Sequence, residues 1–130
     1  MAKWTNDAVL EGLLKYITGD TISNDTTNNR DLCVDNAQPT TRTEAVTTYK
    51  LAATTLTKVT DFTLADDTSG RKATTAQKTG VNVDSTGTAT HVAICDGTNL
   101  LVVTTCTSQA LTSGNTVTIP AFAISVSDPT

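Results

Sequence analysis

The sequence predicts a mainly β protein: a single antiparallel domain, sandwich-like or jelly-roll-like, with one short N-terminal α-helix. Thirty of the 130 residues are threonine, a stiff β-branched residue that suits pleated strands with one face in water. After the first quarter of the chain, turn sequences recur at intervals of about 8–12 residues, which is typical of sandwiches and small barrels. The second half contains no helical segment for a parallel crossover, so we expect antiparallel sheets.

The helix is predicted over residues from about 5 to 18. Apolar side chains recur there at helical spacing and form one stripe, while Thr5 or Asn6 can cap the start and Gly19 can end the helix. The stripe consists of Val9, Leu10, Leu13, Leu14 and Ile17. Such a stripe either covers a sheet of its own domain or docks on a partner.

Residues 19–31 are rich in Asn, Asp and Thr and predict a long exposed loop. The loop lacks the residue order and the closing Glu of an EF-hand, so we expect no calcium site there.

The remaining chain alternates short apolar runs with turns. Residues 71–78 predict an edge strand that its lysines protect. The continuous apolar run Leu-Leu-Val-Val at residues 100–103 predicts a strand buried on both faces. Pro120 shifts the alternation of the last strand and marks a bulge or an edge. The expected strands cover residues 32–34, 62–64, 71–78, 81–83, 88–95, 100–106 and 117–126, and residues 45–51 predict a short strand or an irregular segment.

Composition argues against several classes of partner. The nine Lys and Arg are scattered in a chain of net charge −4, whereas nucleic-acid binding needs a clustered basic footprint. No apolar run is long enough to span a membrane. The first residues lead into the amphipathic helix rather than into the apolar core of a signal peptide, so we expect synthesis in a reducing cytoplasm.

The three cysteines, Cys33, Cys95 and Cys106, have long spacings. A single His and the absence of C-x-x-C leave a zinc site without ligands. We expect three free thiols that pack as small hydrophobic side chains. A Cys95–Cys106 bridge across a hairpin remains the alternative.

Candidate catalytic residues are few. His91 and Cys95 share a strand face but lie roughly 13 Å apart at the rise of a strand, too far for a nucleophile and its base. A Ser–His–Asp triad could be assembled from Ser108, His91 and Asp96, but no nucleophile-elbow motif supports it. Asp66 and Asp67 precede Ser-Gly and favour a turn over a glycosidase pair. The sequence therefore predicts no enzyme, catalytic site, cofactor or metal.

Several segments carry a family resemblance. They are Cys33 with residues 38–41, residues 43–45, 67–72, 87–93, 104–109 and 113–121, together with Trp4 and its helix. Together they resemble a group of small virion structural proteins of tailed bacteriophages, over nearly the whole chain. The motifs are signatures of turns and strands.

The resemblance implies a capsid cement or decoration protein on the outside of the phage head. Its partners would be the major capsid protein and further copies of itself, as a homodimer or homotrimer, and it would be made in the host cytoplasm. The alternative is a tail, neck or fibre component that acts as a receptor- or glycan-binding module. Such modules usually use exposed aromatics, and this chain is only 4% aromatic.

Overall fold

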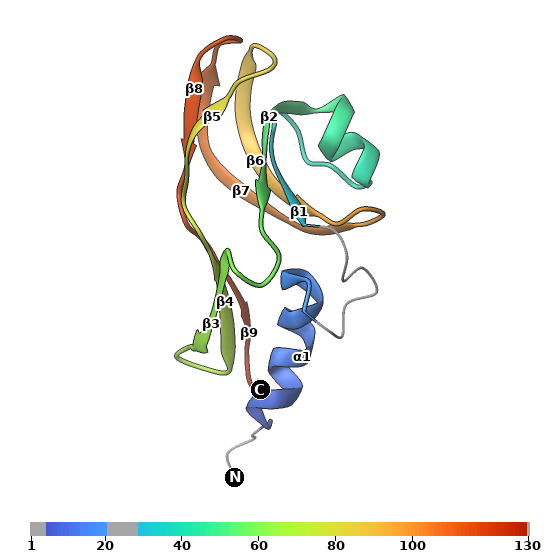
Figure 1. Ribbon diagram of the computed structural model, residues 1–130, viewed down its shortest axis with the longest axis vertical. Coiled ribbons are helices and arrows are strands. Elements are labelled where there is room, and N and C mark those ends of the chain that lie inside the picture. Colours follow the sequence, from blue (N-terminus) through green and yellow to red (C-terminus); the bar gives the residue numbers. More distant parts are fainter. Residues whose placement is uncertain (1–4, 21–28, 130) are drawn as a thin grey trace.

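The computed structural model describes residues 5–20 and 29–129, and Figure 1 shows their arrangement. The described residues form one α-helix, one short π-helix and nine strands. In chain order these are α1 (Asp7–Thr18), β1 (Arg30–Asp35), η1 (Glu44–Thr48), β2 (Lys50–Leu56), β3 (Phe62–Asp66), β4 (Arg71–Thr75), β5 (Lys78–Asn82), β6 (Gly87–Cys95), β7 (Leu100–Leu111), β8 (Thr116–Ile119) and β9 (Ala123–Val126).

The strands form three antiparallel sheets, in the orders β2-β1-β6-β7, β3-β4-β9 and β5-β8. In Figure 1 the long, curved β6 and β7 run beside β5 and β8, while the β3-β4-β9 sheet lies beside α1 at the other end of an elongated molecule. The mainly β, antiparallel fold with one short N-terminal helix is thus confirmed. A jelly-roll topology remains a prediction.

The N-terminal helix is confirmed, and its two ends follow the expected capping chemistry. The Asn6 side chain accepts a 2.8 Å hydrogen bond from the amide of Ala8, which satisfies a donor that the first turn cannot pair internally. Gly19 ends the helix with φ +85°, a conformation that favours glycine. Leu10 and Leu14 are buried, and Figure 1 shows α1 alongside β4 and β9.

The prediction of an exposed loop over residues 19–31 was wrong at its end. Arg30 and Asp31 begin β1, and Arg30 is fully buried. Its guanidinium donates to the carbonyl oxygens of Ile17 and Tyr16 at the end of α1, at 2.8 and 3.0 Å. These acceptors explain how a charged residue occupies the interior. Residues 21–28 of the expected loop lie outside the described residues.

The prediction of a short strand or an irregular segment over residues 45–51 was wrong for most of its length. The π-helix η1 continues to Thr48, and β2 begins at Lys50. The amide of Glu44 donates to the Thr41 hydroxyl at 3.2 Å, and the Glu44 carboxylate accepts from the Thr41 amide at 3.2 Å. This reciprocal pair is a capping box, whose T-x-x-E spacing is readable in the sequence.

Residues 71–78 do not form a protected edge strand. β4 is the central strand of its sheet, with β3 on one side and β9 on the other. Ala73 is fully buried between its neighbours Leu64 and Ile124. Because Ala73 is small and apolar, the strand can pair on both sides although most of its other residues are polar. The predicted strand also ends early, and a separate strand, β5, begins at Lys78.

The alternation shift at Pro120 is real, but its structural result is larger than a bulge. The predicted last strand is divided in two, since β8 pairs with β5 and β9 pairs with β4. Proline has no amide hydrogen and cannot continue a ladder. The chain changes sheets at this residue and so joins the two ends of the molecule.

Two apolar clusters lie on opposite faces of the four-stranded sheet. The larger is shared with β5 and β8 and includes Leu32, Val34, Val92, Ile94 and Ile119. The smaller contains Cys33, Ala45, Ala93 and Cys95. Because Ala45 belongs to η1, this helical turn covers the second face.

Candidate functional site

Asp96 and His91 of the candidate triad have separate partners, and Ser108 is exposed on β7. The Asp96 carboxylate accepts from the amides of Thr98 and Asn99, at 2.7 and 2.5 Å, and thereby holds the turn between β6 and β7. The His91 ring nitrogen Nδ1 lies 2.8 Å from the Thr90 hydroxyl oxygen. An Asp that is committed to its own turn does not orient the imidazole as a triad requires.

Asp66 and Asp67 belong to a turn and its ion pairs. Asp66 pairs with Arg71. Asp67 accepts from the Thr68 amide at 2.9 Å and from the Ser125 hydroxyl at 2.6 Å. The Ser125 hydrogen bond is the main cause that lowers the pKa of Asp67. Asp67 therefore ties the β3–β4 turn to β9, and the Asp66–Arg71 pair joins β3 to β4.

The structure contains a buried carboxylate that was not predicted from the sequence. Asp35, at the end of β1, is fully buried, and its two carboxylate oxygens have no hydrogen-bond partner among the described residues. Burial raises its pKa from 3.8 to about 7. Its cross-strand neighbours are Lys50 and His91, but the Lys50 ammonium pairs with Asp84 at 3.0 Å. The sequence contained one sign that Asp35 is buried: it follows Cys33 by two residues, so both side chains lie on the same face of the strand.

The three cysteines are free, as expected. Cys33 and Cys95 are buried in the smaller cluster, and burial raises the pKa of their thiols to about 12 and about 11. Cys106 packs against the larger cluster, on the other face of the sheet. The alternative of a Cys95–Cys106 bridge was therefore wrong, since the two side chains leave the sheet on opposite sides.

Within residues 5–20 and 29–129, no group of three or more His, Cys, Asp or Glu side chains is placed to hold a metal ion. Neither helix in this part of the chain has the length and apolar character to cross a membrane.

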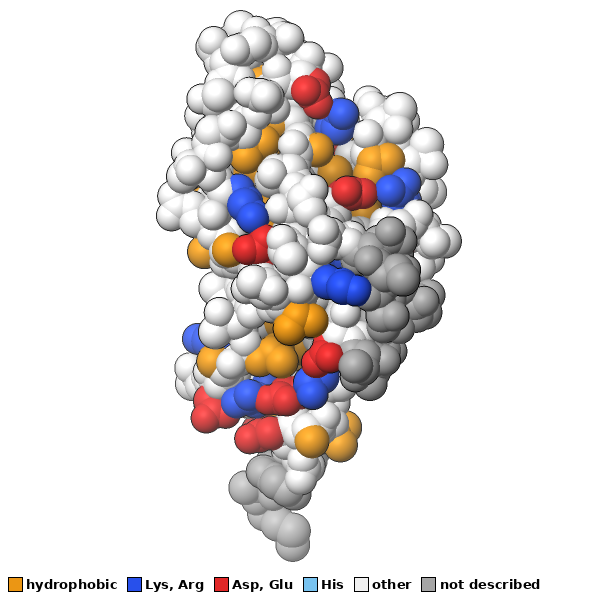
Figure 2. Space-filling model, in the orientation of Figure 1, with side chains coloured by type: hydrophobic (Ala, Val, Ile, Leu, Met, Phe, Trp, Pro, Cys, Tyr) orange, Lys and Arg blue, Asp and Glu red, His pale blue; other side chains and the backbone are white. Residues whose placement is uncertain are grey.

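The apolar stripe of α1 is divided between the interior and the surface. Leu10 and Leu14 are buried, whereas Val9 and Leu13 are 63% and 62% exposed. Val9 and Leu13 are four residues apart and so lie together on one helix face. These two side chains form the helix pair. Figure 2 shows exposed hydrophobic side chains at the end of the molecule where the chain enters α1.

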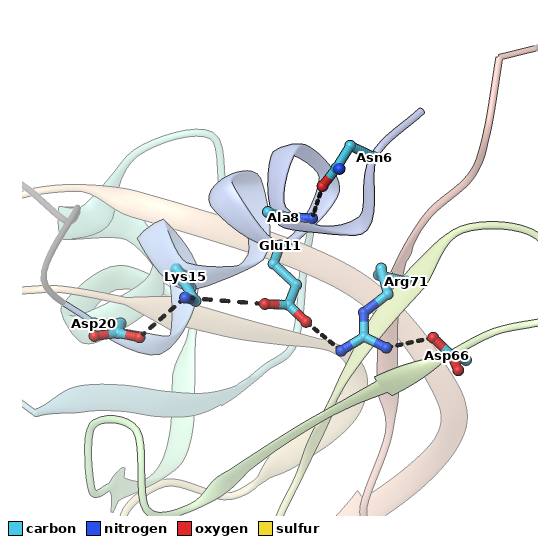
Figure 3. A network of polar contacts seen from close by, with 7 residues as sticks. All are labelled: Asn6, Ala8, Glu11, Lys15, Asp20, Asp66 and Arg71. Carbon is cyan, nitrogen blue, oxygen red and sulfur yellow. Dashed lines mark hydrogen bonds and ion pairs between the residues drawn. The ribbon is translucent and has the colours of Figure 1, made fainter. Parts of the chain in front are cut away.

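Ion pairs hold α1 against the sheet beneath it. Figure 3 shows Arg71 of β4 between Glu11 of the helix and Asp66 of β3. Lys15 lies 3.9 Å from Glu11 and 3.9 Å from Asp20. The Arg71 side chain is only 14% exposed, so water screens its contacts less than those of a surface pair. The helix pair is therefore displayed on a fixed support.

A second apolar surface lies along β7. The sequence predicted burial of this strand on both faces, which was wrong: residues 100–104 are only half-buried and Thr105 is exposed. β7 is an edge strand, so one side lacks a neighbouring strand. Two adjoining hollows of about 190 and 320 Å³ separate β7 from the β8–β9 segment. Both hollows are lined by Val92, Cys106, Thr107, Ile119 and Pro120.

No protein-family model, curated protein or solved structure matches this chain.

Proposed function

We propose that this chain is a non-enzymatic virion structural protein, a cement or decoration protein that binds the outside of a tailed-phage head and stabilises its capsid lattice. The observation that carries the proposal is the helix pair, Val9 and Leu13, which is more than half exposed on a firmly held helix. Exposed aliphatic side chains on a fixed support are suited to docking.

The support is fixed from both ends of the helix. Leu10 and Leu14 anchor it by burial, Arg71 pairs with Glu11 near its middle, and Arg30 binds the carbonyl groups at its C-terminal end. A preformed docking element loses little conformational entropy on binding. This suits a protein that has to bind many equivalent capsid sites.

The choice of capsid as partner rests on the resemblance of the quoted segments to small virion proteins. Those segments fall on framework elements: residues 67–72 form the turn into β4, residues 87–93 lie in β6, and residues 104–109 lie in β7. The helix is part of the same resemblance. The helix pair, on which we base docking, thus lies in a segment that resembles the small virion proteins.

The direct test is titration of the purified full chain onto phage heads that lack it, with the bound copies counted after sedimentation. We expect saturation at a fixed copy number that matches the capsid lattice. Saturation at a handful of copies per particle would instead favour the tail, neck or fibre role.

A matched pair of variants tests the docking surface. Val9→Ser with Leu13→Ser should weaken head binding by at least about tenfold, because two aliphatic side chains that become buried on binding are lost. Val59→Ser is the control, since Val59 is 50% exposed but lies outside the helix, and it should bind like the wild type. Equal binding by both variants would contradict the assignment of the helix pair.

A further inference from the structure

β7 has one hydrogen-bonding edge without a partner. It is the longest described strand, with 12 residues, and it pairs only with β6. No backbone hydrogen bond joins it to another segment among the described residues. In an antiparallel ladder, alternate residues direct their amide and carbonyl groups to opposite edges. About half of this strand therefore presents unpaired groups outward.

The opposite edge of the same sheet is partly paired. β2 pairs there with the segment that follows β5, through a bridge between Ala52 and Val83. The Asp84 amide also donates to the Leu51 carbonyl oxygen at 2.7 Å. The two edges of this sheet therefore differ. β2 has further backbone partners and β7 has none among the described residues, so β7 is the edge at which another strand can be added.

The composition of β7 permits self-association. Its sequence, Leu-Leu-Val-Val-Thr-Thr-Cys-Thr-Ser-Gln-Ala-Leu, contains no Lys, Arg, Asp, Glu, Pro or Gly. Lysine and proline are the usual means by which edge strands resist pairing. The whole chain carries a net charge of −4, so two copies repel each other in general. They can approach along β7 without placing like charges face to face.

Register irregularities limit the stretch that can pair. They fall between Ala89 and His91 and between Ile94 and Cys95 on the β6 side. Between them, residues 102–105 pair regularly with residues 91–94. This four-residue segment is entirely β-branched, which suits cross-strand packing. A twofold axis through this segment would pair it with its own copy, antiparallel, and close the assembly.

We propose that the free edge of β7 pairs with β7 of a second copy of this chain, antiparallel and centred within residues 102–105, and forms a homodimer. The adjoining apolar hollows, lined by Val92, Cys106 and Ile119, lie beside this edge and are covered by the second copy. The resemblance implies a homodimer or a homotrimer without saying how the copies meet. This inference adds the pairing surface, which is separate from the helix pair, and the twofold symmetry. The capsid role and the β7 dimer can each fail while the other holds.

The test is the mass of the purified full chain by analytical ultracentrifugation across micromolar concentrations at low ionic strength. We expect twice the 13.6 kDa of one chain. Thr105→Lys and Thr105→Glu should each sediment as single chains, because Thr105 is exposed and two like charges would meet near the axis. A mixture of the two variants should recover the dimer by opposite charge.

The control is Thr63→Lys, the same change at an exposed residue of β3, another edge strand, and it should remain dimeric. Hydrogen exchange gives a second readout that needs no variant. Within residues 102–105, the amides that point to the free edge should exchange faster when the wild type is diluted, and the amides that point toward β6 should not change. A wild type that is monomeric at every concentration, a threefold mass, or Thr105 variants that fold and stay dimeric would each overturn the proposal.

Discussion

The guanidinium of Arg30 caps the end of α1 from inside the protein, with its Nε atom 2.8 Å from the carbonyl oxygen of Ile17. Arg30 belongs to β1, so this contact joins the helix to the four-stranded sheet. Carbonyl groups in the last turn of a helix have no partner within the helix and carry a partial negative charge. A buried cation at this place satisfies both needs.

Arg30→Met should therefore lower the free energy of unfolding by about 2–4 kcal/mol, because buried carbonyl groups lose their charged donor. Urea denaturation followed by circular dichroism measures the effect. Arg42→Met is the comparison, since Arg42 also donates to a carbonyl, that of Asp96 at 2.7 Å, but its side chain is 32% exposed. We expect a loss of about 1 kcal/mol or less there. Equal losses in the free energy of unfolding would show that the buried Arg30 contact stabilises the protein no more than the partly exposed Arg42 contact.

Gly70 should tolerate no side chain. It has φ +81°, and a Cβ atom at this residue would lie 2.0 Å from the carbonyl oxygen of Val126. Gly70→Ala forces β9 away from the turn and should cost about 3 kcal/mol or more. Gly114 has φ +89°, and a Cβ atom there would meet nothing within 4 Å, so Gly114→Ala should cost only about 1–2 kcal/mol of backbone strain. Thermal denaturation of both variants provides the comparison, and similar costs would contradict the close approach of β9.

Asp35 should make the protein less stable as the pH rises. Burial raises its pKa from 3.8 to about 7, so the folded state retains a proton that the unfolded state releases. The folded state therefore loses stability between about pH 4 and pH 7 and carries the full cost above that range. Asp35→Asn should remove this dependence and raise the free energy of unfolding at pH 8 by about 2 kcal/mol or more.

Asp61→Asn is the matched control, with the opposite sign. The hydrogen bond from Lys78, at 2.7 Å, lowers the pKa of Asp61. Its contribution to stability is present above its unfolded pKa and is lost as the pH falls through the lowered folded pKa. This variant should lose stability at pH 8 rather than gain it. Urea denaturation at pH 5 and pH 8 separates the two, and a destabilising Asp35→Asn at pH 8 would contradict the cost assigned to the buried carboxylate.

The three thiols should differ in reactivity. Burial raises the pKa of Cys33 and Cys95 to about 12 and about 11, so they hold almost no thiolate at neutral pH. Cys106 is partly exposed and should react first with iodoacetamide in the folded protein. Mass spectrometry of digested, labelled protein identifies the modified residue. Labelling of Cys33 or Cys95 before Cys106 without unfolding would contradict this order.

The sequence was most informative where local chemistry decides the structure. Helical spacing and the Asn6 and Gly19 caps predicted α1 correctly, and the Asp-Gly turn after Cys95 separates β6 from β7 as expected. These signals depend on neighbours within a few residues, so they survive without knowledge of the rest of the fold.

Long-range contacts decided the features that were missed. Arg30 resembled a loop residue until α1 supplied its acceptors from 13 residues away. β4 resembled an edge strand because nothing local shows that β9, about 50 residues later, pairs with its second side. β7 resembled a buried strand because its apolar run gives no sign that the sheet ends there. Strand order is a property of the whole chain, and one sequence does not reveal it.

The central claim, docking on a phage head, is tested most directly by an image reconstruction of particles that carry this protein. We predict copies on the outer surface, repeated with the capsid lattice, with Val9 and Leu13 of α1 against the major capsid protein. Density confined to the neck, tail or fibres, or lattice-bound copies with this helix pair facing solvent, would contradict it.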